Sequence, residues 1–339
     1  MWGRSVLLLS VVLSACSSPP EQPILKMEGF AQGTTYHISY WSALPIDGKT
    51  VEAEIEKTLD GIDKTLSNYR PDSTIEAFNA NPSTQSQEVG AEIVSLVRAG
   101  QNMYQLSQGC FDLTIKPLFE LWGFQGEELT IPDQAAIEQA LTRVGMTKLE
   151  VIDDAHLSKK QADVRVDVSA VAQGYSVGKI SGLLEQLGIQ NYLVEIGGEL
   201  KTHGHKPDGQ AWRIAVEKPL PGERSMQKII TMPKDAPMSV MTSGTYRHYF
   251  DVNGRRYSHI LDARNGKPVT HDLVAVTVLH ENPTIADAWS TALLCLGLQD
   301  GMQLANNEKI KALFIRQQGS EFLETRSEAL TTAGQLAIQ

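Results

Sequence analysis

The sequence predicts an α+β fold in which mixed, largely antiparallel sheets pack against helices. Two observations lead to this class. Short strand-like runs follow one another through much of the chain, and Asn253-Gly254 between two of them is a strong signal for a type I′ hairpin turn. A smaller number of helix-like segments stand among these hairpins. Hairpins mixed with helices favour α+β over a doubly wound parallel sheet.

Four segments have the apolar spacing of a helix that turns one face toward a core. In the first of them, Val51, Ile55, Leu59, Ile62 and Leu66 recur every three or four residues, which predicts a helix over 51–66. The same reasoning predicts helices over 93–107, 171–187 and 284–296.

Runs rich in β-branched and aromatic residues predict the strands. In chain order these are 24–41, 149–152, 164–168, 192–196, 212–218, 228–232, 239–242, 246–252, 255–261, 273–280, 312–315 and 322–324. The strand 192–196 ends in Gly197-Gly198, where the backbone either approaches a ligand closely or makes a tight turn.

The first residues of the chain have the pattern of a lipoprotein signal. Arg4 precedes an apolar run, 6–13, that is too short to cross a bilayer as a helix, which needs about 20 residues. Leu13-Ser14-Ala15-Cys16 then resembles a lipobox, whose thiol carries diacylglycerol; an ordinary secretory signal with a chance cysteine is the alternative. We expect a signal peptide over 1–15, lipidated Cys16 with a Pro-rich tether over 16–24, and a single domain over 25–339.

This organisation predicts a protein of the cell envelope, anchored by lipid to a membrane and facing the periplasm, with inner and outer membrane both open. The composition adds that nucleic acid is no partner, because the net charge of −10 is opposite to a basic binding surface. Cys110 and Cys295 could pair in an oxidising compartment. Each lies in an apolar stretch, however, so we expect two buried free thiols.

The first candidate for chemistry is the pair Asp287 and Thr291. In a helix, the spacing i, i+4 puts their oxygens on one face. One carboxylate and one hydroxyl begin a site for a hard cation such as Mg²⁺. A capping Asp and a Thr bonded to its own helix are the alternative, which spacing alone favours.

Three further segments carry polar groups at strand ends or turns. Asp167 precedes a helix start whose amides could hold an anion, although Asp167 and Ser169 could instead cap the helix. Ser243-Gly244-Thr245 suits the close approach of a phosphate, and His259 is a candidate proton carrier near neutral pH or a structural histidine.

In their order and in their residues, these segments resemble the ApbE family, the FAD:protein FMN transferases, from about residue 30 to the last strands. The matching stretches include 33–36, 66–69, 111–114, 121–124, 166–175, 192–198, 212–219, 242–244, 258–262 and 286–292. The sequence departs from many relatives at Gln32, at Gln173 and by lacking a proline after Asp262. None of these departures removes a metal ligand.

The resemblance implies an ApbE-like, T-fold-related architecture and a transferase that uses FAD and Mg²⁺. FMN would be attached to a Thr or Ser hydroxyl of another protein, such as a subunit of a membrane redox pump, and AMP would leave. Asp287, Thr291 and the carbonyl of Ala170 would hold Mg²⁺, and His259 would be the base. The residues implied to line the FAD site are Gln32, Tyr69, Cys110, Phe111, Asp112, Asp167, Gln173 and Leu261.

The charges of the sequence are compatible with binding of FAD and Mg²⁺. A bound Mg²⁺ would supply the positive charge that an acidic protein needs to bind an anionic cofactor. Three other functions remain open at this point. They are a Mg²⁺-dependent FAD pyrophosphatase, a flavin-binding lipoprotein without catalysis, and a structural envelope lipoprotein.

Overall fold

The computed structural model describes residues 23–124, 126, 129–219, 226–252, 255–334 and 337–338. The predicted signal peptide, Cys16, most of the tether and the turn Asn253-Gly254 lie outside the described residues. No helix in the described part of the chain is long and apolar enough to span a membrane.

An eight-stranded sheet organises the molecule, in the order β1-β2-β6-β7-β10-β15-β16-β17, and each neighbouring pair is antiparallel. Its strands are β1 (Leu25–Ala31), β2 (Thr34–Trp41), β6 (Asn191–Ile196), β7 (Glu199–His203), β10 (Met238–Gly244), β15 (Leu273–His280), β16 (Lys311–Gln318) and β17 (Glu321–Arg326). The predicted α+β class with largely antiparallel sheets is confirmed.

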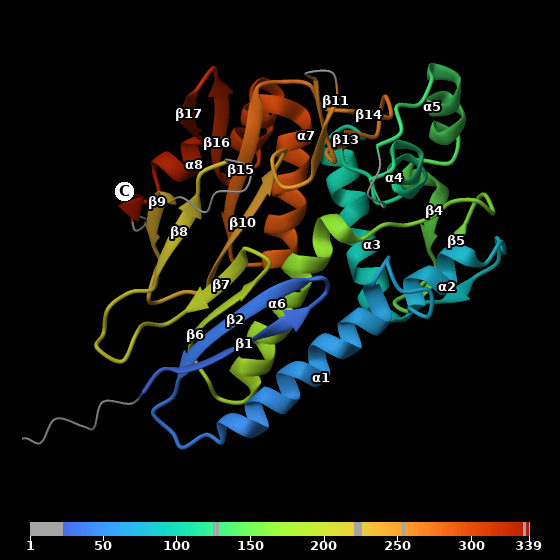
Figure 1. The fold of residues 1–339 in the computed structure, drawn as a ribbon. Coiled ribbons are helices and arrows are strands. Elements are labelled where there is room, and N and C mark those ends of the chain that lie inside the picture. Colours follow the sequence, from blue (N-terminus) through green and yellow to red (C-terminus); the bar gives the residue numbers. More distant parts are fainter. Residues whose placement is uncertain are drawn as a thin grey trace, which may run out of the picture.

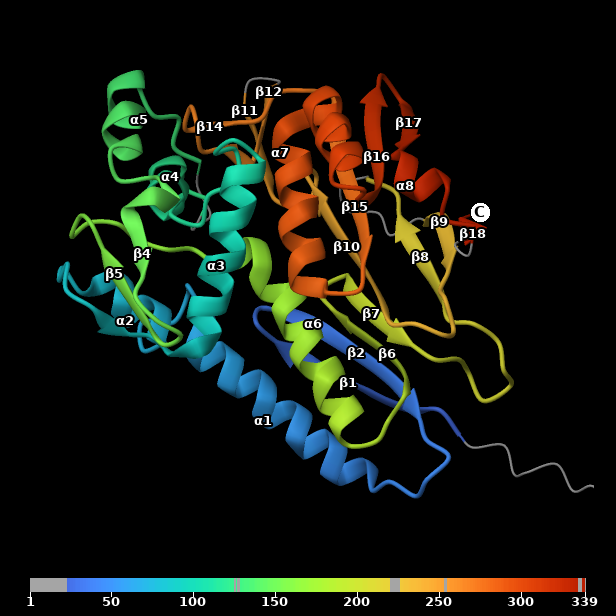
Figure 2. The ribbon, with the colours of Figure 1, turned by 180° about the vertical axis from the view of Figure 1, so that it is seen from behind.

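One face of this sheet carries the long helices (Figures 1 and 2). They are α1 (Gly48–Leu66), α3 (Gly90–Leu106), α6 (Ser169–Gln186) and α7 (Pro283–Asn307). The apolar spacing of α1 has the predicted effect, because Val51, Ile55, Leu59, Ile62 and Leu66 are all buried. α6 and α7 pack against each other over the middle of the sheet, so their facing sides meet in the interior.

The opposite face is covered by a small sheet of β8 (Arg213–Glu217), β9 (Met226–Thr231) and β18 (Ala337–Ile338). Every second side chain of this small sheet packs against side chains of the central sheet, and together they form a second apolar cluster. The alternation is visible in β10, where Val240 belongs to this cluster and Met241 belongs to the core under the helices.

A third group of elements lies at the end of the molecule where α6 begins (Figure 1). It contains α2 (Thr74–Ala80), α4 (Lys116–Trp122), α5 (Gln134–Leu141), a 3₁₀ turn (Met146–Lys148) and the sheet of β3 (Gln87–Glu88), β5 (His156–Lys159) and β4 (Leu149–Val151). The hairpins β11 (Tyr249–Val252) with β12 (Arg255–Ser258) and β13 (Leu261–Asp262) with β14 (Lys267–Pro268) adjoin α4 and α5 through an apolar cluster. The short helix α8 (Glu328–Thr331) packs on β16.

The elements differ from the predicted ones in several places, and β7 of the central sheet was not predicted at all. The predicted strand 24–41 is a hairpin, because Gln32 and Gly33 take φ values of 54° and 74° and turn the chain. The predicted strand 164–168 belongs to no sheet in the described part of the chain. α7 continues to Asn307 beyond the predicted end at 296, with a break at Gly297 (φ 79°). The helices α2, α4 and α5 were not predicted because each is too short to show a clear apolar period.

Candidate active site

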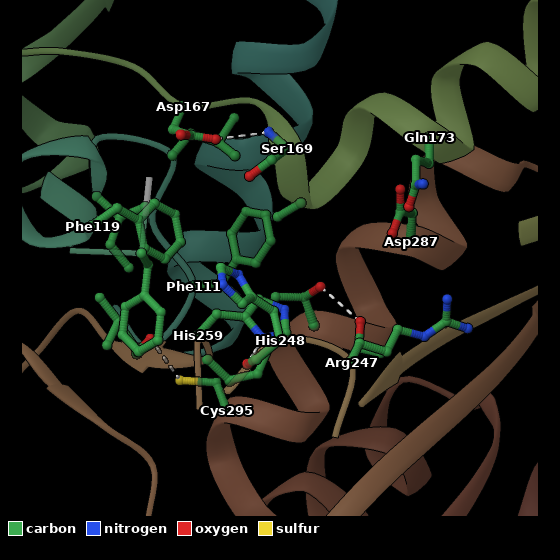
Figure 3. Close-up of a pocket in the computed structure, with 18 of the residues that line it drawn as sticks. Phe111, Phe119, Asp167, Ser169, Gln173, Arg247, His248, His259, Asp287 and Cys295 are labelled. Carbon is green, nitrogen blue, oxygen red and sulfur yellow. Dashed lines mark hydrogen bonds between the residues drawn. The ribbon is translucent and has the colours of Figure 1, made fainter. Parts of the chain in front are cut away.

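A cavity of about 310 Å³ lies where the start of α6, the first half of α7 and the end of β10 meet. It brings together eleven of the twelve described residues that the sequence predicted for the site: Tyr69, Cys110, Phe111, Asp112, Asp167, Ala170, Gln173, His259, Leu261, Asp287 and Thr291. These residues come from segments up to 222 positions apart, counted from Tyr69 to Thr291 as 291 − 69. In Figure 3, Gln173 and Asp287 stand on one side of the cavity, with His248, His259 and two phenylalanines across from them.

Asp287 sits on α7 with its carboxylate turned toward α6. The amide of Gly174 donates to Asp287 Oδ2 at 2.8 Å, and the aspartate is only 6 % exposed. In a regular helix the Gly174 amide would donate to the carbonyl of Ala170, one turn earlier. Because the carboxylate competes for this donor, the Ala170 carbonyl at the cavity wall is the more available to a cation.

Thr291 follows one turn later on the same face of α7. Its hydroxyl is 2.9 Å from Ser243 Oγ, which is also 2.7 Å from Ser290 Oγ. Ser243 is the last residue but one of β10, so the segment that the sequence marked as suited to phosphate lies directly beside the predicted metal ligands.

A second buried carboxylate, Glu199, lines the same side of the cavity and is 3 % exposed. It accepts a hydrogen bond from the amide of Thr242 at 2.8 Å. Burial raises the pKa of Glu199, and burial together with the charge of Glu199 raises the pKa of Asp287. Nearby Arg247 opposes both increases.

These observations fit a divalent cation. Two carboxylates share a buried wall, a hydroxyl and a main-chain carbonyl lie beside them, and all are oxygen donors of the type that Mg²⁺ prefers. A bound cation would relieve the cost of burying the two negative charges.

Asp167 and Ser169 lie at the entrance of α6. Asp167 Oδ1 accepts a hydrogen bond from the Ser169 amide at 2.9 Å, which is a local turn of the capping type (Figure 3). The amide of Asp167 donates to the carbonyl of Leu113 at 2.7 Å. Both residues also line the cavity, so the capping contact coexists with a position at the site.

His259 is half-buried, and one of its ring nitrogens is tied to the main chain. Its Nδ1 is 2.8 Å from the carbonyl oxygen of His248, which cannot donate, so Nδ1 carries the proton and donates. Burial lowers the pKa of His259 to about 4, assisted by the neighbouring His248 and Arg247. At neutral pH the imidazole is therefore neutral, with Nε2 as a proton acceptor.

Aromatic rings surround this histidine. The rings of His248 and His259 are 5.8 Å apart, and Phe124 meets His248 edge-on at 5.8 Å. Phe111 and Phe119 also line the cavity (Figure 3). This wall suits a flat aromatic ligand.

Gln32 is the predicted residue that the main cavity does not include. It lines an adjacent cavity of about 590 Å³, which shares Tyr69, Ser169 and Gln173 with the first. The Gln32 side chain is bound to the hydroxyl of Ser176 at 2.7 Å. The Tyr69 ring is 79 % exposed between the two cavities, so a long ligand could extend over both.

Asp112 lines the cavity, but its carboxylate faces inward. Oδ1 accepts from the amide and hydroxyl of Thr114 at 2.7 and 2.5 Å, and Oδ2 accepts from the amide of Met146 at 3.1 Å. Burial nevertheless raises the pKa of Asp112 to about 6. The carboxylate therefore shapes the Cys110–Thr114 turn rather than presenting itself to a ligand.

The expectation of two free thiols is wrong. Cys110 and Cys295 form a disulfide, with their Cα atoms 6.1 Å apart. Their apolar surroundings in the sequence indicated burial correctly, but each stretch is apolar because it packs against the other. The disulfide joins the Phe111 wall to α7 one turn beyond Thr291.

Sequence reasoning missed Glu199, Arg247 and His248 as cavity residues. The available signals were an acidic residue directly after Gly197-Gly198 in an apolar strand, and two basic residues just after Ser243-Gly244-Thr245. Arg247 also holds the glycine turn, because it donates to the carbonyl of Gly197 at 3.0 Å.

Fold and cavity together define an α+β enzyme with a buried acidic site facing a neutral histidine. The chain belongs to the ApbE family, which it matches over residues 32–314. It is 37% identical over 323 residues to the FAD:protein FMN transferase of Vibrio cholerae serotype O1, covering 94% of this chain and 95% of the relative. It is 34% identical to that of Salmonella typhimurium over 333 residues, with 94% and 93% covered.

Solved structures agree with these sequence relationships. The apo form of the Pseudomonas stutzeri flavinyl transferase ApbE superimposes with a TM-score of 0.84 at 39% identity, over 93% of this chain and 98% of that one. The flavin transferase ApbE from Vibrio cholerae gives a TM-score of 0.83 at 34% identity, over 91% and 99%. The predicted family resemblance is confirmed over the length of the domain.

The contact between α6 and α7 leads to a first prediction. A Cβ on Gly174 would lie 2.7 Å from Cβ of Asp287 and would also collide with the main chain of Pro283. We expect Gly174→Ala to push α7 away from α6 and to reduce FAD binding by at least about tenfold, since overpacking costs roughly 1–3 kcal/mol. Fluorescence titration with FAD measures this loss.

Gly182→Ala is the matched control for this variant. Gly182 lies on the same helix, and nothing within 4 Å meets its added Cβ. This variant should bind FAD as the wild type does and should be slightly more stable. Equal FAD affinities of the two variants would contradict the role of the close contact.

Proposed function

We propose that this protein is a Mg²⁺-dependent FAD:protein FMN transferase that flavinylates a Thr or Ser hydroxyl of acceptor proteins and releases AMP. One observation carries the proposal. A single cavity holds a buried acidic site, Asp287 with Thr291, and a neutral histidine, His259, whose Nε2 can take a proton. The names of the relatives supply the substrate class.

In the proposed reaction, the acceptor hydroxyl oxygen forms a bond to the phosphorus of the FMN half of FAD. The bond between that phosphorus and the bridging oxygen breaks, and AMP leaves with this oxygen. The hydroxyl proton passes to Nε2 of His259 and then to solvent. General-base assistance of this kind contributes roughly 10²–10⁴-fold to a rate.

The side chains of Asp287 and Thr291, with the carbonyl of Ala170, would hold Mg²⁺. A bound Mg²⁺ would neutralise pyrophosphate charge and stabilise the leaving oxygen as a Lewis acid. The contact of His248 with His259 fixes the tautomer, and the phenylalanines exclude water from one side of the cavity. These are contributions of positioning, on which phosphoryl transfer mainly depends.

A second candidate is the hydrolysis of FAD to FMN and AMP. The exposure of Tyr69 favours it, because a cavity whose rim is open to solvent admits water in place of the acceptor. The two reactions differ only in the nucleophile. They are distinguished by whether FAD is consumed when no acceptor is present.

The test combines purified protein, FAD, Mg²⁺ and an acceptor domain that carries a Thr. A transferase yields flavin fluorescence on the acceptor that survives denaturing electrophoresis. Rapid FAD consumption without acceptor would favour hydrolysis, bound FAD without labelled acceptor would favour a non-catalytic flavoprotein, and no flavin binding would favour a structural lipoprotein.

We also propose that the enzyme is a periplasm-facing lipoprotein of the cell envelope, anchored through Cys16. The support is the lipobox-like Leu13-Ser14-Ala15-Cys16 and the Pro-rich segment that follows it. A membrane anchor would raise the encounter frequency with membrane-bound acceptors such as redox-pump subunits. Recovery of the wild-type protein in the soluble fraction after cell disruption would contradict this placement.

A further inference from the structure

The segment that enters α6 is held by side chains where a neighbouring strand would be expected. It passes between α2 and α4 in both views (Figures 1 and 2). Asn79 accepts from the amide of Val166 at 2.7 Å and donates to the carbonyl of Val166 at 2.8 Å. Asn68 donates to the same carbonyl at 3.0 Å and accepts from the amide of Val168 at 2.9 Å.

Asp167 stands between these two valines. Buried backbone groups need partners, and here two asparagine side chains supply them. The place of Asp167 at the cavity therefore depends on the orientation of the two amide groups, together with the hydrogen bond from its own amide to the carbonyl of Leu113. This arrangement also explains how the predicted strand 164–168 satisfies its backbone groups without belonging to a sheet.

One carboxylate oxygen reinforces both amide orientations, which the hydrogen bonds to Val166 and Val168 also favour. Glu76 Oε1 accepts from Nδ2 of Asn68 at 2.8 Å and from Nδ2 of Asn79 at 2.9 Å. An amide can be turned over because its oxygen and nitrogen occupy similar space. With an acceptor facing each nitrogen, only one orientation satisfies the hydrogen bonds to Val166 and Val168.

The charge of Glu76 is balanced inside the protein. Lys116 Nζ lies 2.6 Å from the same Glu76 oxygen and 3.4 Å from the carbonyl of Asn68. The side chains are 5 % exposed for Lys116 and 19 % for Glu76. Breaking such a pair is costly because it leaves an uncompensated charge.

The cluster of Glu76, Lys116, Asn68 and Asn79 joins three stretches of the cavity wall. Asn68 directly precedes Tyr69, Lys116 follows the Cys110–Thr114 turn by two residues, and the valines flank Asp167. In the described part of the chain, Glu76 and Lys116 themselves line neither of the two cavities. Their effect on a ligand is therefore indirect.

We propose that Glu76, paired with Lys116, is a positioning residue of the flavin site. It keeps Tyr69 and Asp167 in place at the cavity without contact to the cofactor. This inference rests on the proposed function, because it takes FAD as the ligand that these two residues meet.

The test compares Glu76→Ala with Glu76→Gln in the full-length protein. The glutamine retains an oxygen that can accept from both asparagines, whereas the alanine does not. We expect Glu76→Ala to weaken FAD binding by at least about tenfold, because both asparagines lose an acceptor. Glu76→Gln should lower the melting temperature, because Lys116 loses its counter-charge, but should keep the FAD affinity within about threefold of wild type. Flavin fluorescence titration well below the melting temperature measures both.

Hydrogen exchange gives a readout that needs no flavin. In Glu76→Ala, the amides of Val166 and Val168 should exchange at least about tenfold faster than in wild type. If Glu76→Ala does not fold, Asn68→Ala removes one half-buried member of the cluster and should accelerate exchange at Val168.

Glu185→Ala is the control for a general loss of stability. Glu185 accepts from the hydroxyl of buried Tyr192 at 2.6 Å near the far end of α6. The variant Glu185→Ala should lower the melting temperature without changing the FAD affinity or the hydrogen exchange of the Val166 amide.

Two results would overturn the inference. One is unchanged FAD affinity and exchange in a folded Glu76→Ala protein. The other is a loss of FAD affinity that follows the melting temperature equally in Glu76→Ala and Glu185→Ala. A wild-type protein that binds no FAD would contradict the proposed function instead.

Discussion

Replacing Asp287 with alanine is expected to reduce FMN transfer by on the order of 10³-fold or more. The variant loses the buried carboxylate that accepts from Gly174 and lies on the helix face of Thr291. Without it, the remaining oxygen donors hold a divalent cation weakly, and the pyrophosphate charge is no longer neutralised. Fluorescent labelling of the acceptor, quantified against time, measures the rate.

Asp300→Ala is the matched control. It removes the same charge from an exposed position on the same helix. Its transfer rate should equal that of the wild type. Undiminished labelling by Asp287→Ala would contradict the assignment of the metal site.

The same carboxylate has an effect on stability that can be measured without substrate. Burial and the charge of Glu199 raise the pKa of Asp287 above its usual 3.8. The folded state then binds the proton more tightly than the unfolded state. In the absence of metal, the free energy of unfolding therefore falls as the pH rises from the unfolded pKa toward the raised pKa of the folded state. Asp287→Asn should show a smaller fall, because buried Glu199 with its own raised pKa remains, and Mg²⁺ should raise the melting temperature of the wild type but not of Asp287→Asn.

Replacing His259 with alanine is expected to slow transfer by roughly 10²–10⁴-fold while FAD affinity stays within about threefold. The reason is that Nε2 takes the hydroxyl proton, whereas Nδ1 is committed to the carbonyl of His248. His156→Ala, at a half-buried histidine that pairs with Asp153 and does not line the cavity, is the control and should leave the rate unchanged. A wild-type rate in His259→Ala would remove the histidine from the mechanism.

The lowered pKa of His259 also predicts the pH profile. With a pKa of about 4, the imidazole stays neutral from about pH 5 upward and becomes protonated below that value. The part of the rate that depends on His259 should therefore be level between about pH 5 and 8 and should fall in more acidic solution. A fall centred near 6.5, the ordinary histidine value, would contradict the buried environment.

Local sequence patterns predicted the elements whose backbone hydrogen bonds are those of a regular helix or sheet. The strand 273–280 coincides with β15, and the helix 171–187 differs from α6 by one or two residues at its ends. The first is a long run of mostly buried, apolar residues, and the second is a long segment rich in residues that a helix tolerates. The segment 164–168 has the composition of a strand, but its backbone partners are the side chains of Asn68 and Asn79, which no local pattern reveals.

The residues of the candidate site also fall into those that a local pattern predicts and those that it does not. Asp287 and Thr291 were recognisable because a single helix brings them together. Glu199 has no such local partner, and its relation to Asp287 depends on how β7 and α7 pack across the sheet. Likewise, the bond between Cys110 and Cys295 joins positions 185 residues apart, so apolar surroundings indicated burial but not pairing.

By itself, the sequence determined the α+β class, the family and eleven of the residues that line the cavity, because spacing along a helix or strand and the residue order of short motifs are local properties. The tertiary structure alone decided the disulfide, the second buried carboxylate, the proton position on His259 and the indirect role of Glu76. Each of these depends on desolvation or on a hydrogen bond between distant segments. Such interactions exist only after the chain has packed. Burying a charge costs free energy in the folded interior, whereas the same charge is solvated by water in the extended chain.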